Sequence, residues 1–232
     1  MTEPYTTRLK QLVDLVEEEG WNDFGFLLFR THYNDEKLWN AFLEAKDQIL
    51  SEAITNAPAE SGLSRITDKM FLKQVSNEAL RDITPEQVAI AYRSLEDGAA
   101  VDDAANGGMS EDRLEPGLRT NVCLMADEEC MRSVVRWMNG DSGSVPFVKA
   151  VDVMLGDEEE LGYSGVFRVA IQSLFTEFYV AQVECVPPNR NATSAGYVAL
   201  IRGDSIEDLM YLNYVAVILD RVPRAPVVLP EA

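Results

Sequence analysis

The sequence predicts an α+β or α/β fold with a single mixed β-sheet flanked by helices. Short apolar segments of strand length alternate with amphipathic segments of helix length in the first part of the chain. After residue 145, several strand-like segments follow one another. That order is typical of a sheet with helices packed on its faces. The 232 residues suit one domain, which we expect to span 1–232.

The first predicted elements follow from apolar spacing. Residues 7–19 place their leucines and valines on one face of a helix, which Gly20 ends. Residues 24–29 (FGFLLF) are too short for a helix and predict a strand buried on both faces. Residues 35–54 repeat apolar side chains every three or four positions, and Asn34 is the expected N-cap of this helix.

The later elements are predicted on the same grounds. Residues 66–80 are weakly helical in pattern, and Thr84, with Gln87 three positions on, marks the start of a helix that runs to about Leu95. A further helix over 127–138 has acids in its first turn and arginines later, and a short helical turn is expected over 173–178. The remaining predicted strands are 119–126, 145–155, 165–171, 179–186 and 197–202.

Two segments lack the spacing of either element. Residues 97–117 are the least hydrophobic stretch and combine a cluster of acids with four of the 14 glycines. We expect a long flexible acidic loop there. The proline-rich residues 222–232 are expected to form an extended tail.

Charge and composition exclude several classes of function. The chain has 39 acidic and 20 basic side chains, a net charge of −19, which repels nucleic-acid backbones and favours cationic ligands or a basic protein partner. No apolar run reaches the roughly 18 residues of a membrane span, and the N-terminus lacks a signal core, so we expect a cytoplasmic protein with no membrane contact. The chain has a single histidine and no glycine-rich nucleotide motif, so we expect it to bind neither a metal nor a cofactor.

The candidate site lies where predicted strands end. Arg30 and Thr31 follow the first strand, Asp127 and Glu128 follow the second, and Asp152 lies near the end of the third. If these strands are parallel, the side chains meet along one edge of the sheet, where open α/β sheets bind ligands. The alternative is structural, with Asp127 capping its helix and pairing with Arg30.

The residue types at this edge suggest roles. Asp127 or Glu128 is the candidate general base, because adjacent carboxylates raise the pKa of one of them, and Arg30 would orient or neutralise a carbonyl or carboxylate group. His32 has a plainer interpretation as a hydrogen-bonded loop residue, and Trp39 and Cys123 are expected in the core. The predicted substrate-binding residues are Thr31, His32, Tyr33, Asp152 and Arg168.

Three segments carry a resemblance to known proteins. Residues 24–42 (FGFLLFRTHYNDEKLWNAF), 118–135 (LRTNVCLMADEECMRSVV) and, more weakly, 147–175 are similar to a large group of small, mostly uncharacterised cytosolic fungal proteins. In that group an apolar strand ends in Arg-Thr-x-Tyr before a helix with a Trp, and a later strand ends in Asp-Glu-Glu.

A weaker resemblance is to fungal arginine-containing cyclodipeptide synthases, transferases of specialised metabolism that join two aminoacyl groups delivered on tRNA. It implies a small-molecule or aminoacyl substrate, although no catalytic residue of that family maps onto this chain. The carboxylates Asp127, Glu128 and Asp152 would suit an arginyl group in a pocket at the strand ends. The charge of −19 disfavours tRNA. The competing hypothesis is a non-enzymatic acidic module that binds a basic protein partner or a cationic small molecule.

Overall fold

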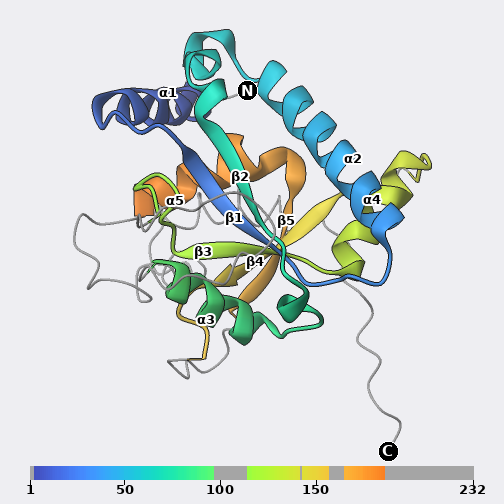
Figure 1. The fold of residues 1–232 in the computed structure, drawn as a ribbon. Helices are drawn as coiled ribbons and strands as arrows, with labels where there is room; N and C mark the ends of the chain where they lie inside the picture. Colours follow the sequence, from blue (N-terminus) through green and yellow to red (C-terminus); the bar gives the residue numbers. More distant parts are fainter. Residues whose placement is uncertain (1–2, 97–113, 142, 157–164, 186–232) are drawn as a thin grey trace, which may run out of the picture.

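A five-stranded mixed sheet forms the centre of the protein. The computed structural model describes residues 3–96, 114–141, 143–156 and 165–185 (Figure 1). The strand order is β2-β1-β3-β4-β5, in which β1 pairs in parallel with β2 and β3, while β3–β4 and β4–β5 are antiparallel. This confirms the predicted single mixed sheet. The strands are β1 (Phe24–Arg30), β2 (Met70–Val75), β3 (Val122–Ala126), β4 (Phe147–Asp152) and β5 (Val166–Ala170).

Helices cover both faces of this sheet. Side chains of β1 and β3 alternate between the faces, so that Phe26 and Leu124 enter one core while Phe29 and Cys123 enter the other. We call these faces the α2 face, which α1, α2, α4 and α5 cover, and the α3 face, which α3 covers (Figure 1). The helices are α1 (Glu3–Glu18), α2 (Glu36–Thr55), α3 (Pro85–Glu96), α4 (Glu128–Met138) and α5 (Tyr179–Cys185).

Local sequence signals explain where several helices begin. Thr84 and Gln87 form the expected capping box, because the Thr84 N–H donates to the Gln87 side chain and the Gln87 N–H donates to Thr84 Oγ1. The N-cap of α2 is Asp35 and not the predicted Asn34, since Asp35 is extended and its carboxylate accepts from the Leu38 N–H at 2.9 Å. The two residues are adjacent and both suit a cap, so spacing alone does not separate them.

Two predicted elements are of the wrong type. Residues 66–80 contain β2 and short 3₁₀ turns, because pairing with β1 outweighs a weak helical pattern. Residues 179–185 form α5 and not a strand, since this apolar stretch is buried against aromatic side chains of β1 and a short apolar run does not distinguish the two structures. Residues 97–113 of the expected loop 97–117, the expected strand 197–202 and the expected tail 222–232 lie outside the described residues.

Gly25 lets β1 and β2 pair closely. Its φ is +142°, and a Cβ at this position would lie 2.1 Å from the carbonyl oxygen of Phe71 on β2. A side chain would therefore displace the neighbouring backbone. Within the described residues, no helix is long and apolar enough to cross a membrane.

Candidate functional site

The strand ends meet as predicted for β1 and β3 but not for β4. Because β4 runs antiparallel to β3, its last residue, Asp152, pairs with Val122, the first residue of β3. Asp152 therefore lies at the opposite edge of the sheet from Arg30, which corrects the expectation that the two meet. Asp152 is buried, and its carboxylate accepts from the Met154 N–H at 2.9 Å. The local role of Asp152 is to hold the turn after β4.

Arg30 and Asp127 lie at the same edge but on opposite faces. Arg30 is the register partner of Ala126, and Ala126 packs in the core of the α2 face. Side chains alternate along a strand, so Asp127 turns towards the α3 face. The expected pairing of Arg30 with Asp127 is wrong for this reason.

Arg30 is held instead by residues around the start of α2. Its Nε donates to the His32 carbonyl at 2.9 Å, and its two terminal nitrogens bind Glu36 at 2.7 and 3.3 Å. The guanidinium carbon lies 4.3 Å from the Tyr33 ring centroid and 4.7 Å from that of Trp39. Arg30 is 5% exposed and Trp39 is buried as predicted. This packing joins the end of β1 to the start of α2.

The other predicted residues beside Arg30 also make structural contacts. The Thr31 N–H donates to the Ala126 carbonyl at 3.1 Å, which continues the pairing of β1 with β3. His32 is buried. The Tyr33 hydroxyl accepts from the Asn77 N–H at 2.7 Å, and burial raises the pKa of Tyr33. None of these contacts requires a ligand.

A second group of charges lies at the same edge, on the α3 face. We call it the edge cluster: Asp127, Glu129, Lys149 and Arg168. Lys149 binds Asp127 and also Glu129, the latter at 3.0 Å, and Arg168 pairs with Glu129. The side chains of Lys149 and Arg168 are only 21% and 18% exposed. The predicted binding residue Arg168 thus connects β5 to the first turn of α4.

The ionisation of Asp127 does not suit a general base. Burial disfavours its charge, but hydrogen bonds from Lys149 and from the Cys130 N–H outweigh burial and hold the pKa of Asp127 below its usual value. The adjacent carboxylates were expected to raise one pKa, so this direction corrects the expectation for Asp127. Glu128 is exposed and forms an i, i+4 ion pair with Arg132 at 2.5 Å. As the structural alternative predicted, Asp127 is the N-cap of α4.

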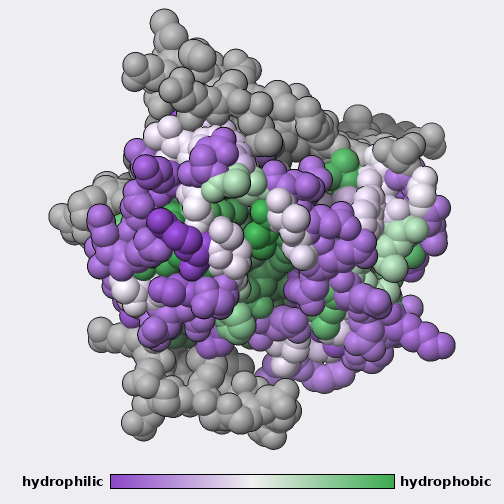
Figure 2. All heavy atoms as spheres, turned by 90° about the horizontal axis from the view of Figure 1, so that it is seen from above, coloured by the Kyte–Doolittle hydropathy of each residue, from purple (hydrophilic) through white to green (hydrophobic). Residues whose placement is uncertain are grey.

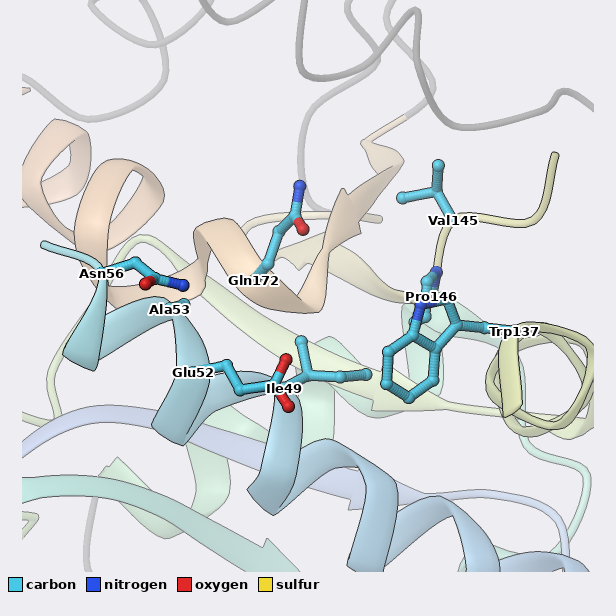
Figure 3. A pocket seen from close by; sticks show the side chains of 8 residues that line it. All are labelled: Ile49, Glu52, Ala53, Asn56, Trp137, Val145, Pro146 and Gln172. Carbon is cyan, nitrogen blue, oxygen red and sulfur yellow. The ribbon is translucent and has the colours of Figure 1, made fainter. Parts of the chain in front are cut away.

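Sequence reasoning missed a pocket at the other end of α4, which Trp137 lines. This α2–α4 pocket has a volume of about 130 Å³. Glu52 and Asn56 lie along the last turns of α2, Trp137 projects from α4 beside Pro146, and Gln172 follows β5 (Figure 3). Its ionisable lining residue is Glu52, whose Oε1 accepts from Gln48 at 2.9 Å. In the part of the chain that the structure describes, no lysine or arginine pairs with Glu52.

Comparisons with protein-family models, with curated proteins and with solved structures found no match for this chain. Among the described residues, no group of three or more histidines, cysteines or acids has an arrangement that could hold a metal ion.

Proposed function

We propose that this protein is a non-enzymatic binding module for a basic protein partner. The observation that carries the proposal is the net charge of −19. The charged residues at the sheet edge do not account for this excess of acids. Within the edge cluster two carboxylates face two cations, so this group adds no net charge. The excess of acids is therefore carried elsewhere, and on α2 the side chains of Glu44 and Glu52 are exposed.

The distribution of charge on the helices supports the same proposal. Neither α1 nor α2 has a basic residue in its last turn, although cations stabilise that end of a helix. Exposed acids lie there instead: Glu18 on α1, next to Glu17, which pairs with Arg65 at 3.0 Å, and Glu52 on α2. Figure 2, which views the side where α1 lies in Figure 1, shows hydrophilic residues on both sides of a hydrophobic hollow. A basic partner would relieve the repulsion among these acids.

Titration of the full-length chain with a basic peptide tests the proposal. We expect binding to a lysine- and arginine-rich 15-residue peptide that weakens steeply between about 25 and 300 mM salt, because screening shortens the range of charge attraction. A peptide of the same length with glutamates in place of the basic residues is the control. Equal binding of both peptides, or no binding of the basic one at low salt, would contradict the proposal.

The geometry supports the competing cyclodipeptide synthase hypothesis less well. An aminoacyl transferase of that type would need carboxylates free to hold an arginyl group, whereas Asp127 is bound by Lys149 and Asp152 lies at the opposite edge. The hypothesis is tested by mass spectrometry of small-molecule extracts from cells with and without the protein. A new cyclic dipeptide would overturn the binding proposal in favour of the enzyme.

A further inference from the structure

We propose that the α2–α4 pocket binds one basic side chain of the partner. This inference rests on the proposed function and assigns it a site. The pocket combines an apolar floor at Ile49, an indole wall at Trp137 and a carboxylate at Glu52 (Figure 3). Lysine and arginine side chains have the matching parts, an apolar stem and a cationic end.

The position of the pocket on α2 favours a cation. Glu52 lies in the last turn of α2, and Asn56 is the C-cap of that helix. The carboxyl end of a helix carries a partial negative charge, which here adds to the charge of Glu52. A cation bound between Glu52 and Trp137 would neutralise the carboxylate and also face the ring of an aromatic residue, which attracts cations.

The size of the pocket limits its occupant. Sites for small molecules and cofactors typically have volumes of roughly 300–1,000 Å³. A volume of about 130 Å³ is well below that range and fits a single side chain better than a nucleotide or a cofactor. The rest of the partner would then lie across the outer surface of α2, where exposed acids such as Glu44 stand.

The backbone beside the pocket is also unusual. Gln172 lies between the end of β5 and a single π-helical turn, Leu174–Phe178. Turns of this kind are rare and are frequent at functional sites. The π-helical turn is itself fixed, because Phe178 stacks on Phe26 of β1 with ring centroids 5.5 Å apart. The segment that follows Gln172 is therefore packed against β1.

Nuclear magnetic resonance of the full-length chain tests the site. The chain has three tryptophans, and the indole N–H signal of Trp137 is assigned as the one lost in W137F. We titrate short glycine peptides that contain a single lysine or a single arginine, with norleucine and citrulline peptides as uncharged controls. Shifts of the Trp137 signal with either basic peptide, and weaker or absent shifts with both controls, are the expected result. Equal shifts with the uncharged peptides would overturn the inference.

A matched pair of variants separates the site from general charge attraction. Glu52→Gln and Glu44→Gln each remove one exposed carboxylate from α2, but only Glu52 lines the pocket. We expect E52Q to weaken peptide binding about fivefold and E44Q to change it less than twofold. If the two variants had equal effects and the basic 15-residue peptide still bound, the pocket would not be the binding site. The proposed binding module would remain supported. If the unaltered protein bound no basic peptide, both the pocket proposal and the binding-module proposal would be wrong.

Discussion

The edge cluster and the α2–α4 pocket differ in the groups that bind their carboxylates. Asp127 and Glu129 are held by Lys149 and Arg168 from two neighbouring strands, whereas Glu52 accepts one hydrogen bond from Gln48 on its own helix. Both regions contain carboxylates, but only those of the edge cluster join separate elements of the fold through ion pairs. The difference indicates that acids at the strand ends stabilise the structure, while the acid at the end of α2 is available to a ligand.

The largest expected effect is on stability and comes from the edge cluster. Lys149→Met leaves Asp127 and Glu129 partly buried without their shared cation, and we expect it to lower the free energy of unfolding by about 2 kcal/mol. Glu52→Gln is the control from the pocket and should change stability by less than about 0.5 kcal/mol. Urea unfolding of the three proteins measures both values. Similar losses in the two variants would remove the distinction between the regions.

The pH dependence of stability sharpens the same comparison and is expected to be smaller. Asp127 has a lowered folded pKa, so its contribution is present above about pH 4 and is lost as the pH falls through that folded pKa. Burial lowers the pKa of Lys149, but hydrogen bonds and charge attraction from Asp127 and Glu129 outweigh it and raise that pKa overall, so its contribution is present below about pH 10.5 and is lost as the pH rises through its folded pKa.

Urea midpoints measured from pH 3 to pH 11 test these two limits. The difference in stability between the unaltered protein and Lys149→Met should be nearly constant between these limits and should shrink at each end. A difference that stays unchanged at both ends would show that the edge cluster does not set the pH limits.

The smallest expected effect separates the two roles of Asp127. Its Oδ1 accepts the Cys130 N–H at 3.0 Å, and its Oδ2 binds Lys149. Asparagine keeps an oxygen for the N-cap but loses the charge, whereas alanine loses both. We therefore expect Asp127→Ala to be less stable than Asp127→Asn by about 1 kcal/mol in thermal or urea unfolding. Equal stability would mean that capping by Asp127 adds nothing to α4.

The sequence was sufficient for features that depend on nearby residues. Apolar spacing predicted β1 and α2, and the preference of helix N-caps for aspartate identified the structural role of Asp127. The direction of β4 was not predictable in this way, because it depends on how the chain returns to β3 and not on the residues of β4. That single uncertainty placed Asp152 at the wrong edge.

The pocket depends on still longer-range packing. Glu52 and Trp137 belong to helices that are brought together by the core of the α2 face, and neither stands in a recognisable motif. The available signal was indirect: an acid and no base near the carboxyl end of α2, where a helix favours the opposite sign. An acid where a cation is usual marks the end of α2 as a candidate site. It does not predict that Trp137 lies beside that end.

Gly25 provides a criterion for recognising relatives of this protein. The carbonyl oxygen of Phe71 occupies the space that any side chain at position 25 would need. A homologue with another residue there must shift β2 along or away from β1 and, with it, the turns that connect β2 to α2. Alignments of candidate homologues should therefore be anchored first on this glycine, because it reports the close pairing of β1 with β2.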